Sequence, residues 1–151
     1  MAAVISGVEP GRNRGRQTMP IASCQCGALT AEVAAYSPMV VACHCIDCQR
    51  RTGSAFGVAA YYPAEAVTVS GAARAYSRPT ATGGTFTTRF CPVCGASVVW
   101  STAKHPGLIG IAVGAFADPQ APPPLRSVWE QSAHPWAELA SVAAHYPQGV
   151  S

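Results

Sequence analysis

Charged residues are scarce in this 151-residue sequence: they make up 11% of the chain, and lysine occurs once, at Lys104. Three of the ten basic residues, Arg12, Arg14 and Arg16, lie in one short amino-terminal segment, and the rest of the chain is close to neutral. Affinity for nucleic acids comes largely from clustered Lys and Arg side chains that neutralise phosphates. The composition therefore argues against nucleic-acid binding by the folded part of the chain.

Long hydrophobic runs are also missing. The longest is Leu108–Ala117, which glycines interrupt and which is too short to span a bilayer; a buried strand is the structure expected for it. The amino terminus has no charged start followed by an apolar segment, so no secretory signal is expected. We therefore expect a chain without a membrane partner that stays in the cytoplasm, a reducing compartment in which thiols persist.

No stretch of the sequence sustains a helical periodicity. Short segments with β pattern are separated by Gly and Pro turns, which favours a mainly β domain. The expected strands are Leu29–Val33, Ala55–Tyr62, Val67–Val69, Ala73–Ser77, Thr85–Phe90, Ser97–Trp100 and Leu108–Val113. Short helical turns are expected at Gln49–Thr52, ended by Gly53, and at Pro63–Ala66.

The first 18 residues differ in character from the rest of the chain. They are rich in Gly and Arg and lack periodicity, so residues 1–18 are predicted to be a disordered extension. Met19 opens a stretch typical of a domain start. Residues 19–151 are predicted to form one domain, which is long enough to bury a core of its own.

Cysteine, in contrast, is abundant, with seven copies in three clusters. An odd number cannot pair completely within one chain, which favours metal ligation over disulfides. Two thiols separated by two residues can hold one ion from a single tight turn, whose amide groups stabilise the thiolate charge. Gly27 and Gly95 each follow a cluster and can adopt the positive φ that closes such a turn.

The number of thiols suggests how they divide between metal ions. Structural zinc prefers four ligands, commonly all thiolates. Two pairs supply four such ligands: Cys24, Cys26, Cys91 and Cys94. The remaining three, Cys43, Cys45 and Cys48, would leave an open metal position, which is typical of catalytic zinc and suits an incoming thiolate. Other partitions remain open, including one zinc with three spare thiols, and so does a redox cluster without metal.

Other residues near the cysteines are less informative. His44 lies between two thiols, but in an extended segment its side chain points away from theirs, so a hydrogen-bonding role is favoured over metal ligation. Phe56 and Trp100 can line a pocket, although large aromatic residues in a β domain more often belong to the core.

Three segments resemble the glutathione-dependent formaldehyde-activating enzyme (Gfa) family, which includes the centromere protein V type domain: Ser23–Gly27, Cys43–Phe56 and Phe90–Gly95. All seven cysteines match. The resemblance implies an Mss4-like fold of small coiled β-sheets with a zinc-stapled core. It also implies two zinc ions per chain. An open three-ligand site is intrinsically weaker, so partial occupancy is expected for the second zinc. The structural zinc is expected at Cys24, Cys26, Cys91 and Cys94, and the second zinc at Cys43, Cys45 and Cys48.

The activity that the resemblance implies is the joining of formaldehyde to glutathione, classed as carbon–sulfur lyase chemistry. Cys43, Cys45 and Cys48 are then the catalytic, open zinc site, where a thiol is held as thiolate and adds to an aldehyde. Arg50 and Arg51 follow the last of these ligands and are candidates to pair with a glutathione carboxylate, the alternative being two solvated surface arginines. The expected partners are a small-molecule thiol and an aldehyde, with glutathione as co-substrate.

A second hypothesis is a non-catalytic zinc-binding interaction module. In this case both zinc ions are structural, or the second is absent, and the basic amino-terminal segment contacts nucleic acid or a protein. The centromere-type relatives motivate this alternative, while the low overall charge argues against its nucleic-acid form.

Overall fold

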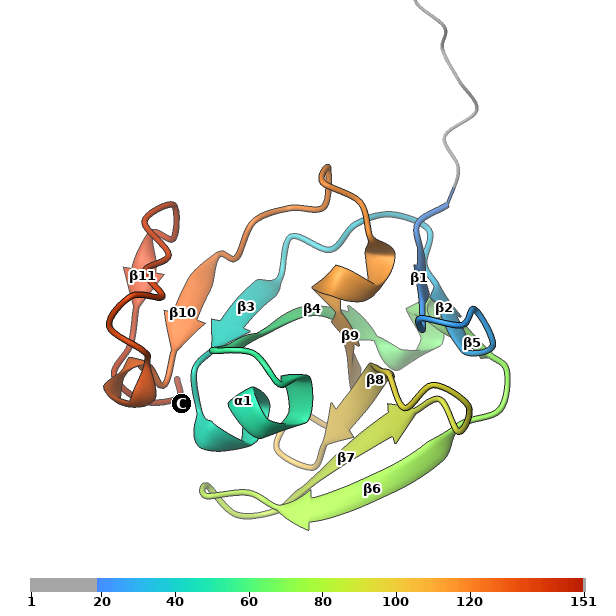
Figure 1. Ribbon diagram of the computed structural model, residues 1–151, viewed down its shortest axis with the longest axis horizontal. Helices are drawn as coiled ribbons and strands as arrows, with labels where there is room; N and C mark the ends of the chain where they lie inside the picture. Colours follow the sequence, from blue (N-terminus) through green and yellow to red (C-terminus); the bar gives the residue numbers. More distant parts are fainter. Residues whose placement is uncertain (1–18, 151) are drawn as a thin grey trace, which may run out of the picture.

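The computed structural model describes residues 19–150, and the prediction of a disordered extension at residues 1–18 lies outside them. Within the described range the chain forms eleven strands, one α-helix and three short 3-10 helices (Figure 1). This mainly β architecture confirms the predicted fold class and is consistent with an Mss4-like fold. Across the same range, the structure contains no helix whose length and apolar character would let it cross a membrane.

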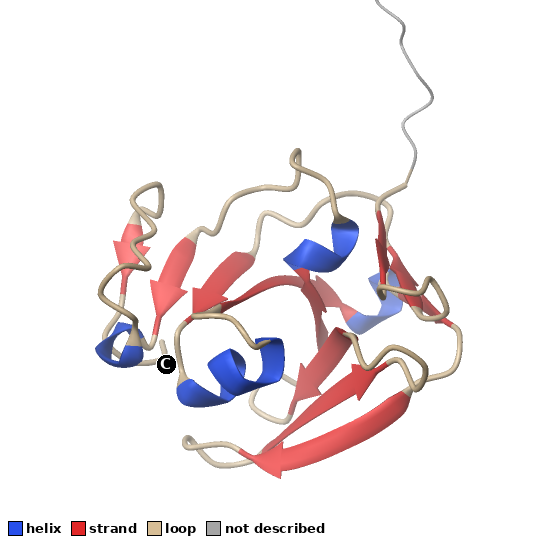
Figure 2. Cartoon of the chain, in the orientation of Figure 1, coloured by secondary structure: helices blue, strands red, loops and turns tan. Residues whose placement is uncertain are grey.

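Eight strands form one large sheet with the spatial order β11-β10-β3-β4-β9-β8-β7-β6. Its strands are β3 (Val40–Cys43), β4 (Gly57–Pro63), β6 (Arg74–Pro79), β7 (Thr85–Phe90), β8 (Ser97–Thr102), β9 (Leu108–Ala112), β10 (Arg126–Val128) and β11 (Ala144–His145). Neighbouring strands are antiparallel, except that β10 runs parallel to both β3 and β11. The sheet curls, and helix α1 (Ile46–Thr52) lies in front of it (Figure 2).

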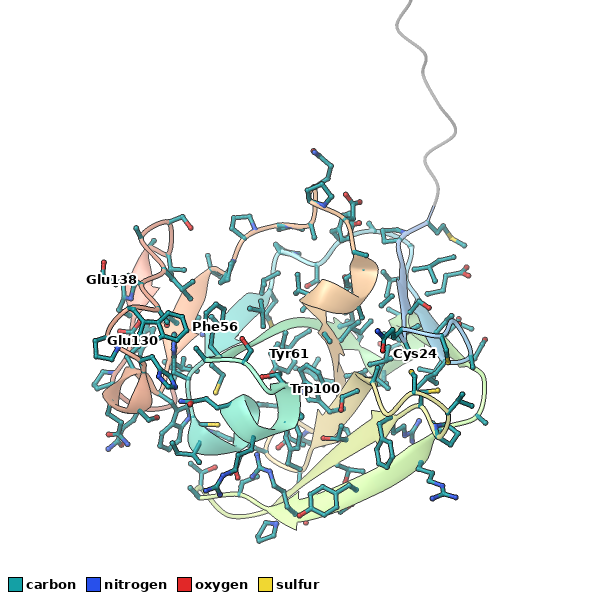
Figure 3. All side chains as sticks on the ribbon, viewed as in Figure 1. Cys24, Phe56, Tyr61, Trp100, Glu130 and Glu138 are labelled. Atoms are coloured by element: carbon teal, nitrogen blue, oxygen red, sulfur yellow. The ribbon has the colours of Figure 1, made fainter. Side chains whose placement is uncertain are left out.

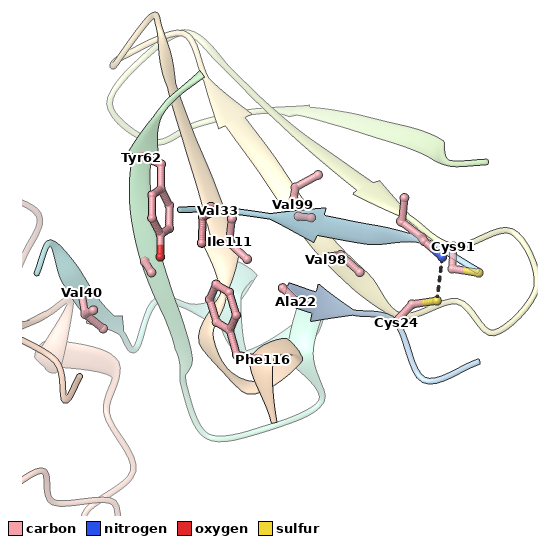
Figure 4. Packing of buried hydrophobic residues seen from close by; sticks show 13 residues of the cluster. Ala22, Cys24, Val33, Val40, Tyr62, Cys91, Val98, Val99, Ile111 and Phe116 are labelled. Carbon is pink, nitrogen blue, oxygen red and sulfur yellow. Dashed lines mark hydrogen bonds between the residues drawn. The ribbon is translucent and has the colours of Figure 1, made fainter. Parts of the chain in front are cut away.

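A second, three-stranded antiparallel sheet lies at the opposite end of the molecule from β10 and β11 (Figure 1). It consists of β1 (Ile21–Ser23), β2 (Thr30–Glu32) and β5 (Thr68–Ser70). The main core fills the space between this sheet and the middle of the large one (Figure 4), and its members include Ala22, Leu29, Ala31, Val98, Val99, Ile111 and Phe116. Burial of these apolar side chains joins the two sheets into one unit.

Helix α1 is only seven residues long, and both of its ends are set by the sequence. Cys45 is the N-cap, and its Sγ accepts a hydrogen bond from the Cys48 amide at 3.4 Å. Gly53 ends the helix in the left-handed conformation, with φ of 65°. The predicted end at Gly53 is confirmed. The helix begins three residues earlier than the predicted Gln49 because a cysteine, which is not a usual capping residue, provides the cap.

The longest apolar run, Leu108–Ala117, is a strand only in its first half. β9 ends one residue before the end of the strand expected at Leu108–Val113, and the expectation of a buried strand over the whole run was wrong beyond it. β9 ends at Ala112, and Val113–Phe116 form a 3-10 helix, η2, that ends at Ala117 in the left-handed region with φ of 50°. The turn carries Phe116 back into the core, where its ring packs edge-on against Tyr36. Apolar composition alone does not distinguish a buried strand from a buried turn.

Only some of the remaining short elements could be predicted from the sequence. The turn predicted at Pro63–Ala66 is present as the 3-10 helix η1 (Ala64–Ala66). Strands β1, β3, β10 and β11 and the 3-10 helix η3 (Glu130–Ser132) were not expected. Each has two to four residues, which is too short for an alternating pattern to emerge.

Candidate metal centres and the adjoining cavity

Four thiols meet beside the core, where the turn after β1 approaches the turn between β7 and β8. The residues of this four-thiol site are Cys24, Cys26, Cys91 and Cys94, whose sulfur atoms all lie within 4.8 Å of one another. The Sγ atom of Cys26 is 3.6 Å from those of Cys24 and Cys91. A tetrahedral zinc with Zn–S bonds of about 2.3 Å places its sulfurs about 3.8 Å apart. The donor set therefore fits a closed zinc site.

Both turns of the four-thiol site are closed by the glycines that follow the cysteine pairs. The Gly27 amide donates to the Cys24 carbonyl at 3.0 Å, and the Gly95 amide donates to the Cys91 carbonyl at 2.9 Å. Gly27 has φ of 82° and Gly95 has φ of 77°. Other residues are strained in this left-handed region, so the glycines allow each pair to present both sulfurs on one side.

Backbone amides point at the sulfurs of the four-thiol site. The Leu29 amide donates to the Cys24 Sγ at 3.2 Å. The backbone amide of Ala96 is the main cause that lowers the pKa of Cys94, to about 6. These amides stabilise thiolate charge, which is the form that binds a metal.

The second group, the three-thiol site, gathers where β3 leads into α1. Its members Cys43, Cys45 and Cys48 place their sulfurs within 4.8 Å of one another, and each side chain is partly buried. The neighbouring thiols, Cys45 first and then Cys48, raise the pKa of Cys43, while Cys43 and Cys48 lower that of Cys45 to about 2. Three thiolates at this separation repel one another unless a cation joins them. The set fits a soft metal such as zinc, with one position left for another ligand.

His44 joins neither thiol group. Its ring is buried and tilts against Phe56 at 5.2 Å between centroids, and its Nδ1 has no hydrogen-bond partner in the described part of the chain. The hydrogen bonds at this position are made by its backbone carbonyl, which accepts from the Gln49 side chain at 2.7 Å and the Ser132 hydroxyl at 3.0 Å. His44 thereby ties α1 to η3.

A cavity of about 610 Å³ opens beside the three-thiol site. All three of its cysteines line the cavity, whereas none of the thiols of the four-thiol site does. Alternate residues of the sheet form the wall, including Val41 of β3 and Gly57, Ala59 and Tyr61 of β4. Because side chains alternate between the faces of a strand, one face of the sheet supplies both the first thiol and the wall.

Two glycines make room in this wall for Arg51 and Trp100. The Arg51 guanidinium lies 4.1 Å from the centroid of the Trp100 ring. A Cβ atom at Gly57 would lie 2.8 Å from Nη2 of Arg51, and one at Gly110 would lie 2.3 Å from Nε1 of Trp100. Arg51 is therefore held by stacking on the indole. Its buried Nε has no hydrogen-bond partner within residues 19–150, and neither ion pair found in that range involves its guanidinium.

The two consecutive arginines of α1 end up in different environments. Arg51 lines the cavity, while Arg50 is exposed and does not. Arg51 lies three residues after Cys48, which places the two side chains on the same side of the helix. The two aromatic candidates also separate: Phe56 packs on His44, whereas Trp100 is buried and lines the cavity.

Several cavity residues were not among the candidates identified from the sequence. Arg78 stacks over Phe86 and pairs with Asp47 at 2.9 Å. Arg126 lines the wall, and its buried Nε has no partner among the described residues. Tyr61 lies beside Trp100 (Figure 3), and burial raises the pKa of its phenol. Only Tyr61 had a usable signal, the Gly-x-Ala-x-Tyr alternation of its strand.

The carboxyl-terminal segment completes one side of the cavity. Gly149 lies against the Trp129 ring, and both residues line the cavity. Upstream, His145 and Glu130 form an ion pair at 2.6 Å. The carboxylate of Glu130 raises the pKa of His145, and Ser127 followed by His145 lowers the pKa of Glu130. The pair fastens the carboxyl-terminal segment to η3.

Comparison with known proteins agrees with this geometry. A crystal structure of a Rhodobacter sphaeroides protein is similar to the chain, with 26% sequence identity, a TM-score of 0.51, and a match that covers 63% of this chain and 85% of that one. No curated protein matches the chain. The model of the glutathione-dependent formaldehyde-activating enzyme family matches residues 19–132, which include all seven cysteines and the arginine stacked on Trp100. This protein therefore belongs to the glutathione-dependent formaldehyde-activating enzyme family.

Proposed function

We propose that the protein is a zinc enzyme of the carbon–sulfur lyase type that joins a glutathione-like thiol to an aldehyde such as formaldehyde. The family to which the chain belongs is named for this activity. The proposal assigns zinc to both thiol groups, with the three-thiol site as the reaction centre. A reducing compartment such as the cytoplasm suits it, because seven thiols must stay reduced to hold two ions.

The observation that carries the proposal is the difference in access between the two groups. The three-thiol site borders the cavity of about 610 Å³, and the four-thiol site does not. Cys43, Cys45 and Cys48 would hold zinc with one position left for a further ligand, and a metal bound there would favour the thiolate form of a thiol substrate. A cavity of this size is in the range of small-molecule sites.

The side chains around the three-thiol site suit an anionic thiol. Arg51, Arg78 and Arg126 line the cavity, and its one described carboxylate, Asp47, is already paired with Arg78. Arg51 is the candidate to bind a substrate carboxylate, because it stands in the same helix as Cys48 and is held on Trp100. Stacking fixes the direction of the guanidinium before the ligand arrives, which reduces the entropic cost of binding.

Metal analysis of the purified protein tests the proposal. We expect two zinc ions per chain in the wild type and one in Cys45→Ser, with the fold retained. The surface variant Arg50→Gln on the same helix serves as the matched control and should keep both ions. One zinc per chain that survives Cys45→Ser would contradict a catalytic zinc at the three-thiol site and favour the interaction-module alternative.

A glutathione titration then tests the thiol chemistry. With cobalt in place of zinc, addition of glutathione should change the absorption of the three-thiol site and leave that of the four-thiol site unchanged. The change should be absent in Cys45→Ser. A spectrum that glutathione does not alter would show that the thiol substrate is wrong, even where two metal ions are bound.

A further inference from the structure

We propose that Tyr61 is the acid–base residue of this site: its phenol donates a proton to the aldehyde oxygen as the thiolate adds to the carbonyl carbon. In the reverse reaction it removes that proton as the adduct breaks down. The inference rests on the proposed thiol–aldehyde function. It adds a residue that neither the cysteine spacing nor the resemblance to the family singles out.

Strand register places Tyr61 on the same wall as the first thiol of the three-thiol site. Cys43 pairs with Gly57 and Val41 pairs with Ala59 across β3 and β4. Gly57, Ala59 and Tyr61 alternate along β4 and all line the cavity. The two residues between the thiols and the phenol are therefore the smallest side chains available. Over Gly57 this space is taken by the Arg51 guanidinium, whose Nη2 lies 2.8 Å from where a Cβ would be, so an adduct between sulfur and phenol would lie against that cation.

Trp100 restricts the position of the phenol. Tyr61 and Trp100 pair with the same residue, Gly110, from its two sides. Gly110 has no side chain, and the indole lies over it, with Nε1 only 2.3 Å from where a Cβ would be. Trp100 thus fills the space beside Tyr61 (Figure 3) and is itself held by Arg51 at 4.1 Å. A preorganised donor of this kind costs little reorganisation during reaction.

The next residue on β4, Tyr62, gives a contrast. It points to the other face of the strand and is buried at 6% exposure. Its hydroxyl accepts a hydrogen bond from the Ser37 amide at 3.0 Å. Tyr62 therefore serves the fold, while Tyr61 faces the cavity in which a ligand would bind.

The other titratable groups of the cavity are less suited to the role. Arginine does not release its proton in proteins. Asp47 is paired with Arg78, and the Lys104 ammonium donates to the Val150 carbonyl at 3.0 Å. His105 is exposed in the turn between β8 and β9. Among these side chains, Tyr61 is the one that is partly buried and also carries a proton that it can transfer.

The proton and electron balance of the step is complete. The sulfur lone pair forms the new S–C bond, and the π electrons of the C=O bond move to oxygen. The O–H bond of Tyr61 breaks and its proton goes to that oxygen, giving the hydroxyl of the adduct. Water then returns a proton to the phenolate. No oxidant or reductant is needed.

The test compares Tyr61→Phe with Tyr62→Phe, using glutathione and formaldehyde with the zinc-loaded protein. For Tyr61→Phe we expect kcat to fall about 100-fold or more, as for loss of a general acid, while the metal content and the KM for glutathione stay at wild-type values. The rate of the wild type should fall in D₂O, and that of Tyr61→Phe should not. Tyr62→Phe should keep the wild-type kcat and unfold at a lower temperature.

The outcomes separate the two proposals. A wild-type protein that does not accelerate adduct formation or breakdown contradicts the proposed function and, with it, the role of Tyr61. An active wild type with an equally active Tyr61→Phe overturns only the role of Tyr61. A Tyr61→Phe variant that loses metal or glutathione binding together with its rate would assign the residue to structure instead.

Discussion

The two thiol groups use the same ligand atom in opposite surroundings. The four-thiol site lies beside the core (Figure 4), with Cys24 and Cys91 buried and Cys26 exposed to solvent. None of its thiols lines the cavity. The three-thiol site stands at the junction of β3 and α1, and all of its cysteines face the cavity. Four donors complete a tetrahedron and leave no position for substrate, while three leave one. The site with a complete set of four ligands does not line the cavity, and the site with three ligands borders it. This difference indicates a structural role for the first site and a chemical role for the second.

The largest expected effect is at the four-thiol site. Cys91→Ser removes a fully buried sulfur and breaks a site whose metal contributes folding free energy, about 10–16 kcal/mol in small zinc domains. We expect no stably folded protein, as measured by circular dichroism and zinc content. Cys45→Ser, which alters the other site, should give a folded protein. A folded Cys91→Ser with unchanged thermal unfolding would remove the distinction between the sites.

Gly110→Ala should disturb the cavity and leave the four-thiol site intact. The added methyl group would lie 2.3 Å from Nε1 of Trp100, and overpacking of this kind costs about 1–3 kcal/mol. We expect lower thermal stability, a shifted Trp fluorescence and weaker thiol binding. Gly114→Ala is the control, since nothing lies within 4 Å of its Cβ position. Equal behaviour of the two variants would show that the wall tolerates movement of Trp100.

Arg51→Gln and Arg50→Gln test whether charge at the cavity selects the thiol. Loss of a hydrogen-bonded charge pair weakens binding by about 1.5–3 kcal/mol, so Arg51→Gln should raise the Kd for glutathione by about tenfold or more. The measurement is calorimetric titration of the zinc-loaded protein. Arg50→Gln, at the exposed neighbour, should bind as the wild type does. An equal rise of the Kd for glutathione in both variants would show only a general effect of net charge.

The smallest effect is expected at the carboxyl-terminal wall of the cavity. His145 has its pKa raised by Glu130, so its contribution to stability is complete below its ordinary value of 6.5 and is lost as pH rises through the raised value. Glu130 has a lowered pKa, so its contribution is present above 4.5 and is lost as pH falls through the lowered value. The ion pair between His145 and Glu130 should therefore stabilise the carboxyl-terminal segment most between about pH 4.5 and 6.5.

Hydrogen exchange measures this pH dependence directly. Amides near His145 and Gly149 should exchange faster above the raised pKa than within the window, after correction for the intrinsic rate. Glu130→Gln should remove the difference. Amides of the four-thiol site should show no such dependence, and an equal change at both places would mean that the whole domain loosens.

Much of the fold was predictable because its signals are local. Alternation at Thr85–Phe90 and the turn at Pro63–Ala66 both correspond to observed elements. Gly53 ends α1 because a residue without a Cβ is needed there. The strand expected at Leu108–Val113 corresponds to β9, whereas the 3-10 helix that follows over Val113–Phe116 was not expected.

The candidate site divides in the same way. Spacing places Cys43, Cys45 and Cys48 within one short segment, so their meeting was predictable. The environment of Arg51 was not, because it depends on Gly57 and Trp100, which come from other strands. Tyr61 becomes a candidate only when strand register places it on the cavity wall.

The sequence by itself determined which residues of this protein can bind metal and how each cluster is shaped, because ligand spacing and the glycines that close each turn are local properties of the chain. The family membership follows from the same motifs. That Cys24 and Cys26 meet Cys91 and Cys94 at one site is a result of the tertiary structure. Only the tertiary structure decided which thiol group faces a cavity and which arginine reaches it. Those outcomes depend on how a curled sheet brings distant strands together, and no local pattern encodes the space left between them.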